Sequence, residues 1–238
     1  IKQYDQGVAA FRRMMDNAAT YSPDEYVRLG QMMGDAGYSK EAIEAFSQAQ
    51  AKIKVLPAEQ QEAARPMIER SLFGIAQAYA TAKQYPEAIQ AVDELLTKYP
   101  QSGLFYDAKF LQGEAFRDSG QLQSAVTALS DVFRYASDPK LINRATMTLA
   151  DVQMKNGDLV DAFASLQRVA LLGDRDNPEY RPVIEEAMIK SVELGVQLAR
   201  HKDVIETCDD YIAVFPQGKH IETIRRLRGE AILKSAAP

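Results

Sequence analysis

Side chains suited to acid–base catalysis or metal binding are scarce in this sequence. The chain contains two histidines, His201 and His220, and a single cysteine, Cys208. The histidines are too far apart to form the His-x3-His pair that binds a metal from one face of a helix. We therefore interpret both as solvent-exposed side chains rather than as metal ligands or general bases.

The segment GDRDNPEYRPVIE matches the spacing of a calcium-binding loop only in part. Asp174, Asp176 and Glu185 stand at positions 1, 3 and 12 of such a loop. Pro178 and Glu179, however, occupy positions that require a ligand and a glycine. The sequence also lacks the glycine motifs of phosphate-binding loops and nucleophile elbows. We predict that the protein is not an enzyme and uses no metal and no cofactor.

The charge pattern excludes a nucleic-acid-binding footprint. The chain has 28 Lys and Arg against 33 Asp and Glu, a formal charge of -5, with both signs interspersed. Basic residues cluster at Arg225, Arg226 and Arg228, which could form either a solvated helix face or a docking patch. No apolar run approaches the roughly 20 residues that a membrane-spanning helix needs. We therefore expect neither a nucleic-acid partner nor a membrane span.

A repeated pattern explains most of the remaining sequence. Five segments each place a turn before a helix that opens with a small or β-branched residue, and Gly37, Gly120 and Gly157 stand in three of these turns. We expect positive φ angles at these glycines, because helices commonly end in a left-handed residue. Apolar residues recur at three- and four-residue spacing on both sides of each turn, which predicts paired helices with one apolar stripe each. Two such helices cannot bury both stripes alone, so successive pairs must stack. The five segments that each place a turn before a helix are residues 34–46, 80–92, 117–129, 154–166 and 199–208.

One stretch of the chain occurs twice. Residues 99–116, YPQSGLFYDAKFLQGEAF, return 116 positions later as residues 215–232, FPQGKHIETIRRLRGEAI. This distance is three repeat units, so both copies are junctions at which one helix pair closes and the next helix begins. Cys208 falls in the second helix of the fifth pair, at a position where the repeat favours Phe or Leu. A buried apolar role for Cys208 is therefore favoured over that of a nucleophile.

These features resemble the tetratricopeptide repeat (TPR) family, whose signature places small and aromatic residues at the positions occupied here by Tyr26, Gly30, Ala42 and Phe46 in the first full repeat. The resemblance implies an all-α fold, a right-handed α-solenoid of stacked helix-turn-helix units that forms a single domain over residues 1–238. The expected parts are a partial repeat at 1–22, repeats at 23–57, 66–100, 103–138, 141–173 and 182–216, and a capping helix at 219–235.

The resemblance also implies where a partner would bind. In the family, the first helices line a concave groove, into which the fifth and ninth residues of each unit point. We therefore expect a partner segment with apolar anchors in this groove, although the fifth-position side chains could equally be further core. The carried-over fifth positions are Val27, Phe73, Phe110, Met147 and Ile189, and the ninth positions are Gln31, Gln77, Glu114, Asp151 and Glu193.

The function that follows is a non-catalytic protein–protein interaction scaffold. The tyrosine–proline junction and the helix after it are similar to those of bacterial envelope TPR proteins, including outer-membrane assembly lipoproteins and a Tol-associated periplasmic factor. We therefore expect a cell-envelope assembly or secretion complex, in the periplasm or at the outer membrane. The alternative is a cytoplasmic adaptor or co-chaperone.

The amino-terminal residues match the interior of a repeat. Residues 2–15 align with residues 83–96, so residue 1 falls near the end of a first helix. We expect Val8, Phe11 and Met15 to form an uncovered apolar surface, through which copies of the chain could self-associate.

Overall fold

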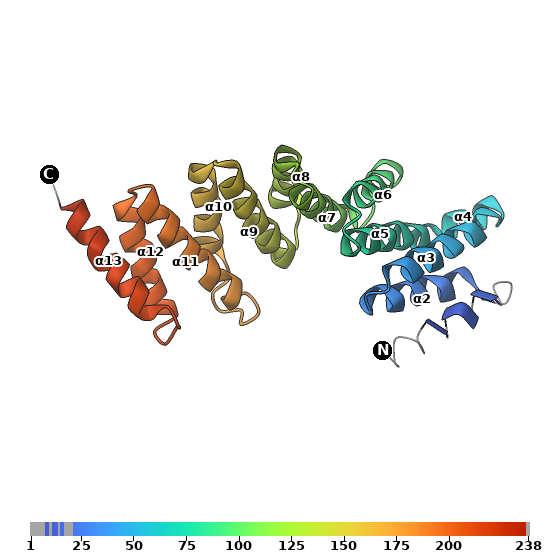
Figure 1. The fold of residues 1–238 in the computed structure, drawn as a ribbon, viewed down its shortest axis with the longest axis horizontal. Helices are drawn as coiled ribbons and strands as arrows, with labels where there is room; N and C mark the ends of the chain where they lie inside the picture. The colour runs from blue at the N-terminus through green and yellow to red at the C-terminus, as the bar shows by residue number, and fades with distance from the viewer. Residues whose placement is uncertain (1–7, 10, 14, 17–20, 237–238) are drawn as a thin grey trace. The chain divides into compact units, whose positions relative to one another are not determined.

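The computed structural model describes residues 8–9, 11–13, 15–16 and 21–236. Its elements are α-helices throughout these residues, and Figure 1 shows them following one another as short rods joined by tight turns. The predicted all-α fold of stacked helix-turn-helix units is confirmed. The chain divides into two compact units, Ile1–Gln121 and Leu122–Pro238, which we call unit 1 and unit 2.

Among its described residues, unit 1 contains two helix pairs followed by one further helix. The helix α4 fills the insertion between the first two pairs, and each helix packs against its neighbours in the sequence. The described helices of unit 1 are α2 (Pro23–Asp35), α3 (Ser39–Lys54), α4 (Ala58–Ala63), α5 (Arg65–Thr81), α6 (Tyr85–Lys98) and α7 (Phe105–Asp118).

Unit 2 continues the alternation and ends in a single helix. Its core joins residues of α9 through α13, with Leu166, Ile184, Met188 and Tyr211 among the fully buried side chains. The helices of unit 2 are α8 (Leu122–Tyr135), α9 (Pro139–Asn156), α10 (Leu159–Leu172), α11 (Arg181–Gln197), α12 (His201–Val214) and α13 (Ile221–Ser235). We call α2, α5, α7, α9 and α11 first helices, and α3, α6, α8, α10 and α12 second helices.

The turn inside each helix pair contains a residue in the left-handed region. The positive φ angles predicted for Gly37, Gly120 and Gly157 are confirmed at 82°, 81° and 87°. Lys83 and Ala199 take the same place in the other two turns, with φ of 59° and 54°. In each turn the following N–H donates to a carbonyl five residues earlier, a Schellman-type closure of the first helix. The left-handed residue is therefore required by the turn, even where the sequence carries no glycine.

The sequence predicted that Val8, Phe11 and Met15 form an uncovered apolar surface at the amino-terminal end, and for Phe11 this prediction is wrong. Phe11 is only 3% exposed and belongs to the same buried cluster as Tyr26 and Phe46. Met15 is half-buried and packs against that cluster. The apolar face of this segment is thus used within unit 1, because α2 and α3 supply the partner surface that the sequence alignment could not reveal.

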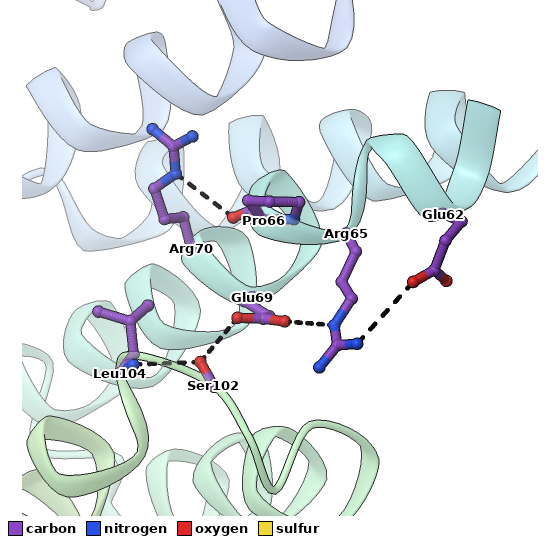
Figure 2. A network of polar contacts seen from close by, with 7 residues as sticks. All are labelled: Glu62, Arg65, Pro66, Glu69, Arg70, Ser102 and Leu104. Atoms are coloured by element: carbon purple, nitrogen blue, oxygen red, sulfur yellow. Dashed lines mark hydrogen bonds and ion pairs between the residues drawn. The ribbon is translucent and has the colours of Figure 1, made fainter. Parts of the chain in front are cut away.

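The first copy of the doubled junction is held by a polar network in unit 1 (Figure 2). Glu69 of α5 accepts hydrogen bonds from Arg65 Nε at 2.7 Å and from the Ser102 hydroxyl at 2.7 Å. The Ser102 oxygen in turn accepts a hydrogen bond from the Leu104 N–H at 3.1 Å. The Arg65 guanidinium also lies 5.4 Å from the centre of the Tyr99 ring. These contacts fix the path of the chain from α6 to α7.

The second copy in unit 2 keeps part of this arrangement, 116 residues later. Arg181 lies over the Phe215 ring at 4.9 Å, as Arg65 lies over Tyr99. Glu185, the counterpart of Glu69, accepts a hydrogen bond from the Tyr211 hydroxyl at 2.7 Å. The doubling of the sequence therefore extends upstream to an Arg-Pro-x-x-Glu segment at the start of α5 and α11, which pairs with each junction.

Candidate partner-binding groove

The first helices of unit 1 enclose a cavity of about 190 Å³ between α2 and α5. Gln31 and Gln77, predicted as ninth-position groove residues of consecutive repeats, both line it. The Phe46 ring and the glycines of α2 and α5 complete the lining. The space that side chains at Gly30 and Gly74 would need is filled by the Phe46 ring, which forms the base of the cavity.

A neighbouring cavity of about 320 Å³ lies between α5 and α7. Gln77 and Thr81 line both cavities, and Glu114 lines the second. Tyr85 and Leu111, both half-buried, add apolar surface to it. The two cavities are neighbours that share Gln77 and Thr81, and together we call them the unit-1 groove. Three of the predicted ninth-position residues meet in it.

The polar groups of the unit-1 groove suit recognition of a peptide backbone. Gln31 is exposed and donates from Nε2 to the Asp35 carboxylate at 2.9 Å. Gln77 is exposed, and its amide can offer both a donor and an acceptor. Glu114 lies 3.9 Å from the Arg117 guanidinium, at the long end of an ion pair. The groove therefore offers amides on α2 and α5 and carboxylates towards α7.

In unit 2 the predicted groove residues lie on α9 and α11. Asp151 accepts a hydrogen bond from Lys190 Nζ at 2.9 Å, and Glu186 lies 2.9 Å from the same nitrogen. Burial lowers the pKa of Lys190, but the hydrogen bonds to Glu186 and Asp151 outweigh it and leave that pKa raised. Lys190 thus neutralises part of the carboxylate line that the sequence predicted here. Sequence reasoning missed Lys190, although it lies next to the predicted residue Ile189.

Ile189 and Glu193 line a third cavity, of about 470 Å³, between α11 and the start of α13. His220 and Lys219 line the same cavity. His220 and His201 are both half-buried, so the two side chains predicted to be solvent-exposed are exposed only in part. The tertiary structure brings His220 to α11 because the second junction folds back against that helix.

The fifth-position residues do not form one open apolar line. Val27, Phe110 and Met147 are each less than 8% exposed and belong to the packing between helices. Phe73 and Ile189 are half-buried and keep partial access to solvent. The alternative interpretation, that fifth-position side chains are further core, therefore describes three of the five. Their proposed role in binding stays a prediction.

The surroundings of Cys208 and of the arginine cluster on α13 test two further interpretations of the sequence. Cys208 is fully buried, and desolvation raises the pKa of its thiol to about 11, as expected for an apolar core residue. Each arginine of the α13 cluster has an acidic partner. The partners are Glu222 for Arg225, Glu230 for Arg226 and Asp209 for Arg228. The cluster is therefore a solvated, ion-paired helix face.

Within the described residues, no group of three or more His, Cys, Asp and Glu side chains is arranged to hold a metal ion. None of the described helices combines the length and the apolar character needed to cross a membrane.

Comparisons with known proteins agree with the repeat architecture. The chain of RapI in its apo form superposes with a TM-score of 0.62 at 14% identity, covering 96% of this chain and 69% of RapI. A putative kinesin light chain with TPR-like repeats from Podosopora anserina superposes with a TM-score of 0.57 at 17% identity. The match covers 90% of this chain and 97% of that one. A Rap protein complexed with Competence and Sporulation Factor superposes with a TM-score of 0.52 at 16% identity. The match covers 94% of this chain and 68% of the Rap protein. At these identities the likeness shows the fold alone.

Comparison with the curated proteins gave no match. Two tetratricopeptide repeat family models match the sequence, one at residues 70–102 and one at residues 110–179. The first match covers most of α5 and all of α6, and the second includes the helix pair α9–α10. The chain therefore carries tetratricopeptide repeats in these segments.

Proposed function

We propose that this protein is a non-catalytic interaction scaffold that binds an extended segment of a partner protein in the unit-1 groove. The observation that carries the proposal is the line of Gln31, Gln77 and Glu114 along three consecutive first helices, joined by two cavities that share Gln77. One protein of similar fold, a Rap protein, was solved as a complex with Competence and Sporulation Factor. The fold is thus compatible with holding a partner molecule.

The groove defines the chemistry of the segment. Gln31 and Gln77 would pair with backbone amides, which favours an extended peptide over a folded surface. Half-buried Tyr85 and Leu111 offer a site for one apolar anchor between α5 and α7. Glu114 and Asp118 line the same cavity with Arg117, which pairs with both, and two carboxylates against one arginine favour a Lys or Arg next to that anchor. The predicted partner is therefore a peptide segment with an apolar residue beside a basic one.

A random peptide library displayed on phage tests this function directly. Peptides of about ten residues extend roughly 33 Å, enough to cross three packed helices. We expect enriched peptides to contain an apolar residue next to Lys or Arg, and a labelled synthetic copy to bind the protein in fluorescence anisotropy. Gln77→Arg places a bulky cation at the shared point of both cavities and should weaken binding at least about tenfold.

A matched control separates groove binding from non-specific attraction. Gln90→Arg adds the same charge on the exposed surface of α6, outside both cavities, and should leave the dissociation constant unchanged. Enriched peptides that bind Gln77→Arg as tightly as the unmodified protein would disprove the groove. Failure of any peptide to enrich would likewise argue against it.

For the setting, we propose a bacterial cell-envelope assembly or secretion complex. The support is the tyrosine–proline junction at Tyr99 and Pro100, whose style is similar to that of envelope TPR proteins. Fractionation of the native cell, with an antibody against this chain, should recover it with periplasmic or outer-membrane material. Recovery with the cytosol alone would favour the alternative, a cytoplasmic adaptor or co-chaperone.

A further inference from the structure

Unit 2 contains a second hollow that the proposed function does not use. It lies between the second helices α8 and α10, both of which pack against α9, and has a volume of about 650 Å³. Leu149 and Gln153 of α9 line it, whereas the predicted groove residues of that helix are Met147 and Asp151. Residues two apart on a helix point about 200° apart. This hollow, which we call the α8/α10 cleft, therefore lies on the opposite face of α9 from the predicted groove.

The floor and one rim of the α8/α10 cleft are apolar. Leu149 is buried at the bottom, and Phe133 of α8 is half-buried beside it. On the rim, Leu171 and Leu172 at the end of α10 are 47% and 72% exposed. Two neighbouring leucines in water beside a hollow are unusual for a solvated surface and are typical of interaction sites.

Three charged side chains line the cleft, the two arginines Arg134 and Arg168 and one carboxylate, Asp161. Arg134 of α8 and Arg168 of α10 both line it, and the Arg168 guanidinium lies 4.3 Å from the centre of the Phe133 ring. Among the described residues, neither arginine forms an ion pair, in contrast to Arg225 and Arg226 of α13. Two arginines against one carboxylate leave the lining with an excess positive charge, in a chain whose net charge is -5, so the cleft offers a positive site beside exposed leucines.

The shape of the cleft favours a helix over an extended strand. Its two walls are helices, so a third helix can lie between them with its ridges in their grooves. Ser130 of α8 and Ala164 and Ser165 of α10 are small residues in the lining, which lets a third helix approach closely. An extended strand would find no free sheet edge here among the described residues, which are helical on both walls.

We propose that the α8/α10 cleft binds an amphipathic helix of a partner protein, which presents apolar side chains to Phe133, Leu171 and Leu172 and carboxylates to Arg134 and Arg168. The proposal is independent of the unit-1 groove, because it uses different helices and the opposite charge preference.

Two designed helical peptides of about 18 residues, roughly 27 Å long, test it. Both carry the same leucine face, while the polar face is Glu-rich in one and Lys-rich in the other. Fluorescence anisotropy should show saturable binding of the Glu-rich peptide and no saturable binding of the Lys-rich one. The double variant Arg134→Glu/Arg168→Glu should bind the Glu-rich peptide at least about tenfold more weakly and gain affinity for the Lys-rich peptide.

The control variant is Arg225→Glu/Arg226→Glu, which makes the same charge change on exposed residues of α13, outside the cleft. It should leave binding of the Glu-rich peptide unchanged, as should Gln77→Arg in the unit-1 groove. Circular dichroism should show equal helicity for all variants. No binding of the Glu-rich peptide, equal binding of both peptides, or the same loss in the control would each overturn the proposal.

Two further measurements examine other occupants of the cleft. A concentration-dependent dimer in light scattering that Leu172→Glu abolishes would assign the cleft to a second copy of this chain. Sedimentation with phosphatidylglycerol vesicles that the same variant abolishes would assign it to a lipid surface. Either result would overturn the helix proposal, whereas a monomer that ignores vesicles and binds the Glu-rich peptide supports it.

Discussion

Phe46 occupies the space that a side chain at Gly74 would need. A Cβ built on Gly74 would lie 2.3 Å from Cζ of Phe46, and one built on Gly30 would lie 2.8 Å from the same ring. The ring is therefore held between a glycine of α2 and a glycine of α5, and it is 2% exposed. This contact sets how closely two successive helix pairs approach, and it forms the base of the smaller cavity in the unit-1 groove.

Gly74→Ala is expected to destabilise unit 1, because the enclosed Phe46 ring cannot move away without disturbing Gly30. Overpacking of this kind costs about 1–3 kcal/mol. Urea unfolding followed by circular dichroism should show the loss. The matched control is Gly103→Ala in the same unit, where a Cβ would meet nothing within 4 Å and no loss is expected.

The Phe46–Gly74 contact also predicts non-additivity. Phe46→Leu removes the far end of the ring, so Gly74→Ala should cost less in that background than in the unmodified protein. Equal costs in both backgrounds would show that the added methyl group meets something other than the ring.

Ala199→Gly is expected to stabilise unit 2 by roughly 0.5–1 kcal/mol. Ala199 has a φ of 54°, where a Cβ is strained and glycine is not. Gly157→Ala creates the same strain in another turn of unit 2, at a φ of 87°, and should destabilise by a similar amount. Thermal unfolding of both variants checks the pair. A fall in stability for Ala199→Gly would contradict the strain argument.

Phe110→Ala is expected to lower the free energy of unfolding by about 3–5 kcal/mol, because the ring is 5% exposed and its loss leaves a cavity. Gln77→Ala in the same unit removes an exposed amide and should change stability by no more than about 0.5 kcal/mol. Chemical unfolding of the two variants distinguishes core from groove. If Phe110→Ala were as stable as Gln77→Ala, the Phe110 side chain would not be part of the core and would be available in the groove.

Stability should fall at alkaline pH because of Cys208. Its folded-state pKa of about 11 lies above the ordinary thiol value of 9.0, since burial disfavours the thiolate. Between these values the unfolded chain loses the proton and the folded protein keeps it, so the folded state loses stability as pH rises through that window. The contribution falls by at most about 1.4 kcal/mol per pH unit.

Cys208→Ala isolates this effect, although the variant is less stable overall. Tyr211, whose pKa burial and its hydrogen bond to Glu185 raise to about 12, is present in both proteins and cancels in the comparison. Urea unfolding at pH 8, 9 and 10 should show a steeper loss with pH for the unmodified protein. Parallel pH profiles would mean that the thiol titrates in the folded state as it does in the unfolded chain.

Local sequence patterns predicted the helices and their turns. The apolar periodicity of α5 and α6 and the glycines at 37, 120 and 157 are properties of short segments, because helix stripes and left-handed turns depend on residues within a few positions. The burial of Cys208 also followed from its place in the repeat. The ninth-position residues Gln31, Gln77 and Glu114 were predicted from the repeat register alone; each lines at least one of the two neighbouring cavities, and their role in binding stays a prediction.

The tertiary structure decided what lies between helices that are distant in sequence. The sequence could not show that Val27, Phe110 and Met147 are covered, that Lys190 reaches Asp151, or that Phe11 packs against α2 and α3. Nor could it show the cleft that brings Arg134 and Arg168 together. The physical reason is that periodicity fixes which face of a helix is apolar, whereas the distance and angle between packed helices depend on pairs such as Phe46 and Gly74, which meet only after folding.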